Sequence, residues 1–162
     1  MYKKEIERKW LVKVDKLPNL EELEYIDIKQ GYLSQNHDSL MVRVRSESGK
    51  KFTLDLKDGD SKIRNEITFN ISEEEFNIGF LLAGQKTISK RRFYVPSSKD
   101  PSRILELDIF KDSDLNHLIM VEYEAESEIL VDTLIEEEWF GKEVTDDSKY
   151  TNVQLAYKRA GI

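Results

Sequence analysis

The chain has 162 residues, of which 39% are hydrophobic and 35% charged, and its formal net charge is −7 because 32 Asp and Glu outnumber 25 Lys and Arg. This length suits one domain, which we expect to span residues 1–162, and the acidic balance argues against a general nucleic-acid-binding protein. Cysteine is absent, which excludes disulfides, thiolate metal sites and cysteine nucleophiles.

The sequence carries no recognisable signal for export or for membrane insertion. Met1 is followed by polar residues rather than by the apolar run of a signal peptide. No apolar stretch reaches the roughly 18 residues of a membrane span. We therefore expect a cytoplasmic protein that has neither a membrane nor a nucleic acid as its partner.

The first predicted strand, residues 5–10, places Glu5, Glu7 and Lys9 on one face, because successive strand side chains point to opposite faces. The Cα atoms of the two glutamates are then about 6.6 Å apart. Two such carboxylates repel each other unless a cation lies between them. Oxygen ligands suit Mg²⁺, Mn²⁺ or Ca²⁺ better than zinc. The alternative is a charged face that is merely wetted by solvent.

Alternating apolar and polar residues predict further strands along the chain. They cover residues 25–33, 40–45, 51–57, 62–71, 87–95, 104–110 and 118–125. A hairpin turn is expected at 48–50, and polar turns at 34–38 and 58–60. Many antiparallel strands can close into a barrel, and eight strands leave room for one small ligand.

Three helices are expected. Ser72 and Glu75 form a capping-box pattern for a helix that runs to about Ala83 and stops at Gly84. Its predicted core side comprises Phe76, Phe80, Leu81 and Ala83. A second amphipathic helix is predicted over 127–138, with Ile129, Leu130, Leu134 and Ile135 apolar. An irregular aromatic segment, 139–150, and a short helix, 151–159, close the chain, and a helical turn is expected at 19–23.

Like-charged residues recur two positions apart on the polar faces of the predicted strands. Such pairs are Glu5/Glu7, Arg43/Arg45, Glu106/Asp108 and Glu122/Glu124. Like charges on one face cost stability, so their separation by strand is unusual for a solvated surface. Acidic strands that hold metal ions and basic strands that hold a polyanion would explain it. We predict an α+β protein, mainly antiparallel β, whose closed eight-stranded barrel has a charged lumen and is covered by a few helices.

These residues resemble the CYTH superfamily, the triphosphate tunnel metalloenzymes. Glu5-Ile6-Glu7-Arg8-Lys9 looks like the family's E-x-E-x-K signature. Further segments follow in the family's order: Lys29-Gln30-Gly31-Tyr32-Leu33, Arg43-Val44-Arg45, Arg64-Asn65-Glu66, Lys90-Arg91-Arg92-Phe93, Glu106-Leu107-Asp108-Ile109-Phe110 and Glu122-Tyr123-Glu124. The end of the chain, including Asp147, Lys149, Tyr150 and Asn152, is similar to that of the short bacterial members, so the resemblance covers about residues 3–157.

The resemblance implies a barrel tunnel that binds a triphosphate through basic side chains and a divalent metal, Mg²⁺ or Mn²⁺, through acidic ones. The implied phosphate-binding residues are Lys9, Arg43, Arg45, Lys57, Arg64, Lys90 and Arg92. The implied metal ligands are Glu5, Glu7, Glu122 and Glu124, with Asp108 as a further candidate. A catalytic lysine–tyrosine pair that activates the attacking water would be Lys90 with Tyr32.

Hydrolysis of inorganic tripolyphosphate to pyrophosphate and phosphate is the function that this resemblance implies. Thiamine triphosphatase and adenylyl cyclase activities occur in the same superfamily and stay open, as does a homodimer. Thr68 stands where many members have a second acid, and Asp55 is an unusual acid beside the phosphate lysines. These two residues keep open a polyphosphate- or nucleotide-binding module without turnover.

Overall fold

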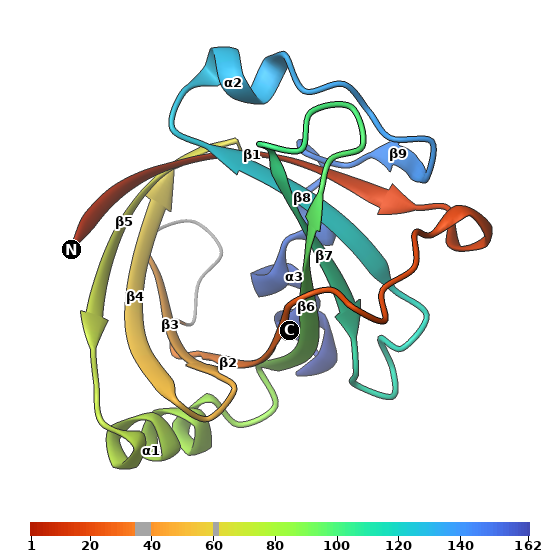
Figure 1. Ribbon diagram of the computed structural model, residues 1–162. Helices are drawn as coiled ribbons and strands as arrows, with labels where there is room; N and C mark the ends of the chain where they lie inside the picture. Colours follow the sequence, from red (N-terminus) through yellow and green to blue (C-terminus); the bar gives the residue numbers. More distant parts are fainter. Residues whose placement is uncertain (35–39, 60–61) are drawn as a thin grey trace.

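An antiparallel sheet that closes on itself forms the body of the molecule (Figure 1). The computed structural model describes residues 1–34, 40–59 and 62–162, so the turn predicted at 34–38 and the end of the one at 58–60 lie largely outside the described residues. The strands are β1 (Tyr2–Val12), β2 (Tyr25–Tyr32), β3 (Met41–Glu47), β4 (Lys51–Gly59), β5 (Ile63–Asn70), β6 (Thr87–Pro96), β7 (Ile104–Phe110), β8 (Ile119–Ala125) and β9 (Phe140–Glu143).

The strand order is β5-β4-β3-β2-β6-β7-β8-β1, and a pairing between β1 and β5 closes the circle. The long β1 makes this possible, because its first half pairs with β5 (Glu5 opposite Arg64) and its second half with β8 (Lys9 opposite Glu122). The short β9 pairs with β1 as an additional strand. The predicted closed eight-stranded barrel is confirmed, and so are all eight predicted strands within a few residues of their ends.

Three α-helices, α1 (Glu73–Ala83), α2 (Glu128–Asp132) and α3 (Asn152–Arg159), and two 3₁₀ turns, Val14–Lys16 and Ser148–Tyr150, complete the described fold. The turn predicted at 19–23 is present as a single turn in which the Leu23 amide donates to the Leu20 carbonyl oxygen at 3.2 Å, but it is not helical. The 3₁₀ turn of this connection lies earlier, at Val14–Lys16. Within the described residues, no helix has both the length and the apolar character needed to cross a membrane.

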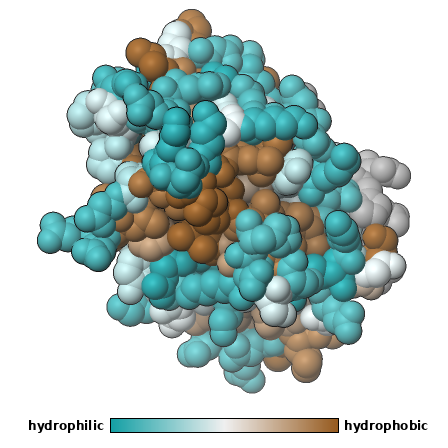
Figure 2. Space-filling model, turned by 90° about the vertical axis from the view of Figure 1, so that its right-hand side faces the viewer, coloured by the Kyte–Doolittle hydropathy of each residue, from teal (hydrophilic) through white to brown (hydrophobic). Residues whose placement is uncertain are grey.

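The outward face of the barrel is apolar on one side and buries a large cluster. Trp10, Leu107 and Val121 are fully buried there, and Trp139 and Phe140 cover them. The ring centroids of Trp10 and Phe140 are 4.7 Å apart. The irregular aromatic segment predicted after residue 138 therefore contains β9, which the sequence did not indicate. Figure 2 shows apolar side chains gathered in the middle of the face on which β9 lies, with hydrophilic residues around them.

The inward faces are charged along most of their length but become apolar at one end. Tyr32, Ile88, Phe110 and Met120 form a second buried cluster with Leu155, Ala156 and Tyr157 of α3. α3 thus packs on inward-facing side chains of the barrel rather than only on its outside. The sequence predicted inward charge and outward apolar faces, and this apolar end is the exception to it.

Helix α1 confirms the predicted caps. Ser72 and Glu75 form the capping box, and Gly84 ends the helix with a positive φ of 63°. The helix packs closely against β3, because a Cβ on Gly79 would lie 2.7 Å from a methyl group of Val44. Phe76 and Ala83 are buried as predicted, but Leu81 is 79% exposed, so its predicted core position is wrong. Only one side of α1 meets the sheet.

Helix α2 is much shorter than the predicted 127–138 helix. Arg103, from the loop before β7, donates to the carbonyl oxygen of Leu130 (2.8 Å) and to the hydroxyl of Thr133 (3.0 Å), which satisfies the end of the helix. Ile129 and Ile135 are 75% and 63% exposed, so most of the predicted apolar side is wrong. Val131 and Leu134 anchor this segment instead.

Candidate active site

The barrel encloses a cavity of about 360 Å³, which we call the lumen. This volume lies in the range of small-molecule sites, roughly 300–1,000 Å³. All seven predicted phosphate-binding residues line it: Lys9, Arg43, Arg45, Lys57, Arg64, Lys90 and Arg92. Four of the five predicted metal ligands also line it, namely Glu5, Glu7, Glu122 and Glu124, and so does Tyr32. The fifth, Asp108, is fully buried behind Lys90 and Arg92.

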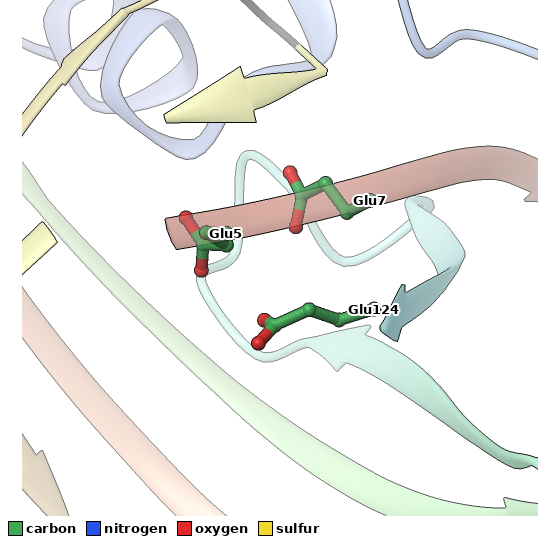
Figure 3. A group of neighbouring side chains, drawn as sticks. All are labelled: Glu5, Glu7 and Glu124. Carbon is green, nitrogen blue, oxygen red and sulfur yellow. The ribbon is translucent and has the colours of Figure 1, made fainter. Parts of the chain in front are cut away.

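Three carboxylates, the acid cluster, converge on one wall of the lumen. Glu5 and Glu7 project from β1 and Glu124 from β8, and one oxygen of each lies within 4.8 Å of the others (Figure 3). Burial and the nearby charges of Glu122 and Glu5 raise the pKa of Glu7 to about 7. Burial acts the same way on Glu5, but the Lys57 ammonium outweighs it and holds the Glu5 pKa at about 2.

The acid cluster fits a divalent metal ion. Its donors are carboxylate oxygens only, which suits hard cations such as Mg²⁺ or Mn²⁺. Burial is the largest cause of the raised pKa of Glu7, so a cation bound beside this carboxylate would favour its charged form. Of the predicted ligands, the cluster includes Glu5, Glu7 and Glu124. Glu122 lies beside it, in an ion pair with Lys9 at 2.9 Å.

A second group of charges, which we call the β6–β7 network, consists of acids and cations that are paired with one another. Asp108 accepts from Lys90 Nζ at 2.6 Å and from two nitrogens of Arg92 at 2.7 and 2.8 Å. Arg92 also pairs with Glu106 and with Glu122. Each charged group in this network therefore has at least one partner of opposite sign.

Lys90 differs from Arg92, the other cation of the network, in the direction of its pKa shift. Burial lowers its pKa to about 8, against the opposing effect of Asp108. Its ammonium also donates to the Asn152 side-chain oxygen at 3.2 Å, at the start of α3. Sequence reasoning gave Asn152 no role, although the residue belongs to the recognised terminal motif.

The strands β3, β4 and β5 carry a further set of ion pairs. Asp55, almost fully buried, accepts from two nitrogens of Arg43 at 2.9 and 2.7 Å. Lys57 bridges Glu5 and Glu66 at 2.7 and 2.8 Å. Thr68, where a second acid was expected from the family, donates to Glu66 at 3.2 Å. Two more of the predicted phosphate-binding cations, Arg43 and Lys57, thus have carboxylate partners, as Lys9, Lys90 and Arg92 do.

Arg45 is less well satisfied. Burial and the charges of Arg43 and Arg92 lower its pKa, and its nearest acid is Glu47 at 3.0 Å. Its Nε is buried and has no hydrogen-bond partner within the described part of the chain. A guanidinium held among other guanidinium groups favours an incoming anion.

The predicted pair of Lys90 and Tyr32 lies on neighbouring strands, but offset. The ladder places Lys90 opposite Ile28, four residues before Tyr32 on β2. The hydroxyl of Tyr32 accepts instead from the Gln30 amide at 2.8 Å. Gln30 was not predicted as a site residue; its place two residues before Tyr32, on the same strand face, is the signal that could have found it.

Comparison with known proteins identifies the family to which the sequence is similar. The CYTH domain family matches residues 3–150. The chain is 35% identical over 153 residues to a protein described as an inorganic triphosphatase from Nitrosomonas europaea, covering 94% of this chain and 96% of that protein.

Solved structures agree on the fold. An inorganic triphosphatase crystal structure superimposes with a TM-score of 0.70 at 32% identity, covering 94% of this chain and 93% of the other. A putative adenylate cyclase from Bacillus halodurans superimposes with a TM-score of 0.60 at 19% identity, over 81% of this chain and 85% of the other. The second likeness concerns the fold alone.

Proposed function

The chain belongs to the CYTH domain family, and we propose that it is a metal-dependent triphosphatase that hydrolyses inorganic tripolyphosphate to pyrophosphate and phosphate. One observation carries the proposal: seven cationic side chains and a cluster of three carboxylates line the same enclosed lumen. The inorganic triphosphatase that is 35% identical over almost the whole chain supports the choice of substrate.

Binding of the substrate would exchange partners within the lumen. Arg43 and Lys57 now pair with Asp55, Glu5 and Glu66, and phosphate oxygens offer them charge-assisted hydrogen bonds of the same kind. Arg45, with its unpartnered Nε, gains most from an anion because burial and neighbouring cations disfavour its charge. Arginine also binds phosphate in a bidentate manner.

We propose that the acid cluster is the binding site of the metal ion. Glu5, Glu7 and Glu124 would hold it, with Glu122 and Asp108 as the predicted further ligands, and Mg²⁺ or Mn²⁺ is the ion we propose. When bound, the ion neutralises phosphate charge and lowers the pKa of a bound water. The three side chains supply the negative charge that keeps it beside the lumen cations.

Hydrolysis needs a water oxygen to attack the terminal phosphorus while the phosphoanhydride bond breaks, which releases pyrophosphate and phosphate. Little covalent chemistry is required of the protein, so positioning and charge stabilisation dominate. Lys90, whose pKa is lowered to about 8, is the group we propose for accepting the water's proton in its neutral form. Asp108 and Asn152 hold its nitrogen in place.

A substrate panel tests the proposal. Purified protein is given tripolyphosphate, ATP, thiamine triphosphate or pyrophosphate, each with Mg²⁺, Mn²⁺ or EDTA, and phosphate release is measured. We expect preference for tripolyphosphate and complete loss with EDTA. Preference for thiamine triphosphate or ATP would show that this compound, and not tripolyphosphate, is the substrate. Tight tripolyphosphate binding by calorimetry without phosphate release would establish a binding module instead.

The remaining predictions from the sequence are kept as part of the proposal. They are a single domain over residues 1–162, a cytoplasmic location, a small-molecule triphosphate as the partner, and neither nucleic acid nor membrane as a ligand. Whether the protein forms a homodimer is settled by light scattering of the purified chain.

A further inference from the structure

Gln30 is a fully buried amide in a lumen lined mostly by charged residues. It lies on β2 between Ile88 of β6 and Arg45 of β3 in the ladder, and its exposed fraction is 0%. Its side-chain nitrogen donates to the hydroxyl of Tyr32 at 2.8 Å. The two side chains share the inward face of the strand because they are two residues apart.

The other end of this amide indicates that packing alone does not account for it. The Gln30 side-chain oxygen is buried and has no hydrogen-bond partner among the described residues. Burying an amide with one end unsatisfied costs stability, and methionine would fill a similar volume without that cost. The bond to the Tyr32 hydroxyl is what the amide adds.

The donor on Gln30 restricts the direction of the Tyr32 hydroxyl proton. The amide nitrogen of Gln30 can only donate, so the Tyr32 oxygen accepts from it. The hydroxyl proton of Tyr32 then points away from the Gln30 nitrogen, and Tyr32 lines the lumen.

We propose that Gln30 is a positioning residue that turns the Tyr32 hydroxyl into a hydrogen-bond donor toward a phosphoryl oxygen of the bound triphosphate. The inference rests on the proposed function and deepens it. Because its oxygen already accepts from Gln30 and its proton points away from that donor, Tyr32 donates a hydrogen bond rather than accepting a proton from water. The proton acceptor is then Lys90, and the two residues act on different atoms, which agrees with their offset along the β2–β6 ladder.

Two substitutions of similar size test this. Gln30→Glu presents only acceptor oxygens when ionised, so it draws the Tyr32 proton toward itself and away from the lumen. Gln30→Met removes the donor and introduces no charge. We expect either variant to lower kcat about tenfold with KM changed less than twofold, because the affected bond strengthens in the transition state.

The same substitutions in a Tyr32→Phe background separate a positioning role from a structural one. We expect Gln30→Met to cause no further loss there, since the hydroxyl it orients is gone. A loss of equal size in both backgrounds would overturn the proposal. Unchanged kcat in Gln30→Glu would also overturn it, because the amide would then be reversed and would accept from Tyr32.

A readout independent of turnover distinguishes this proposal from the proposed function. Tyrosines labelled with ¹³C at the ring carbon that bears the hydroxyl are observed by NMR, and Tyr32→Phe identifies the signal. Added tripolyphosphate should shift this signal in the natural sequence but not in Gln30→Glu. Absence of any shift in the natural sequence overturns the Gln30 proposal, whereas a shift without phosphate release overturns only the hydrolysis.

Discussion

Two charged regions of the lumen contain similar residues and differ in charge balance. In the acid cluster, Glu5, Glu7 and Glu124 lie together, and the pKa of Glu7 is raised to about 7. In the β6–β7 network, Asp108 is fully buried, yet Lys90 and Arg92 bond it at 2.6 to 2.8 Å and its pKa is lowered.

This difference in pairing indicates which buried charges are available to bind a ligand. An excess of one sign invites a counter-ion from outside, whereas a balanced network holds its own side chains in place. By this criterion we propose that the acid cluster binds a ligand and that the β6–β7 network positions Lys90. Four experiments test this contrast.

The largest effect is expected at Asp108. Asp108→Ala leaves Lys90 and Arg92 buried with less compensation, and breaking such a pair costs about 3–5 kcal/mol of unfolding free energy. Asp27 is the matched control, because it also pairs with two cations, Arg91 and Lys111, but at the surface. Asp27→Ala should cost about 1 kcal/mol or less. Urea unfolding measures both, and equal losses would abolish the contrast.

In the acid cluster, removal of a charged carboxylate should stabilise the fold at neutral pH, whereas removal of Asp108 destabilises it. A folded-state pKa of about 7 for Glu7 lies above its ordinary value, so the unfolded chain releases this proton first. Stability is then full below about pH 4.5 and declines as pH rises to 7, by about 3 kcal/mol for a shift of this size. Urea unfolding in EDTA should give this decline, and Gln at position 7 (Glu7→Gln) should remove it. A decline of the same size in Glu7→Gln would contradict the assignment.

Lys90 should appear in the pH dependence of turnover. Because kcat/KM reports the free enzyme, it should rise about tenfold per pH unit below pH 8 and level off above it, as Lys90 loses its proton. Lys90→Arg keeps its proton and should lose this limb together with most activity. Initial rates with tripolyphosphate and Mg²⁺ between pH 6 and 9.5 measure it. An unchanged limb in Lys90→Arg would assign the titration to another group.

The smallest effect on stability is expected at Ser72, which lies outside both regions and serves as a reference for them. Ser72→Ala removes the cap of α1, which accepts from the Glu75 backbone, and should cost about 1 kcal/mol. Turnover and its pH profile should stay unchanged, because α1 packs on the outer side of β2, β3 and β4. Thermal unfolding and the phosphate assay measure the two properties. Lost turnover in a folded variant would mean that α1 influences the lumen.

Much of this fold was predictable because strand alternation is a local signal. Each inward position of β1, Glu5, Glu7 and Lys9, follows from a period of two, and closure of the barrel accounts for the charged interior. The caps of α1 at Ser72 and Gly84 are equally local. These parts depend on residues that are near one another in the chain.

The parts that escaped prediction depend on contacts between distant residues. Arg103 donates to the Leu130 carbonyl oxygen and to the Thr133 hydroxyl where helix α2 ends, and Phe140 of β9 packs on Trp10. In the site, the sequence pair of Glu106 and Asp108 gave no sign that Lys90 and Arg92 of β6 would hydrogen-bond Asp108. Whether a buried acid binds or balances is decided by its cross-strand neighbours, which a sequence does not list.

The role of β1 as the shared seam of the barrel has a consequence for how the chain folds during synthesis. β1 is made before the other strands, yet it pairs with β5 through one half and with β8 through the other. Glu5 and Glu7 therefore cannot approach Glu124 until most of the chain has been made. Such non-local pairing gives slow folding, in milliseconds to seconds. The three carboxylates come together only after β8 has been made, so a metal ion held by all three could not guide the early steps of folding.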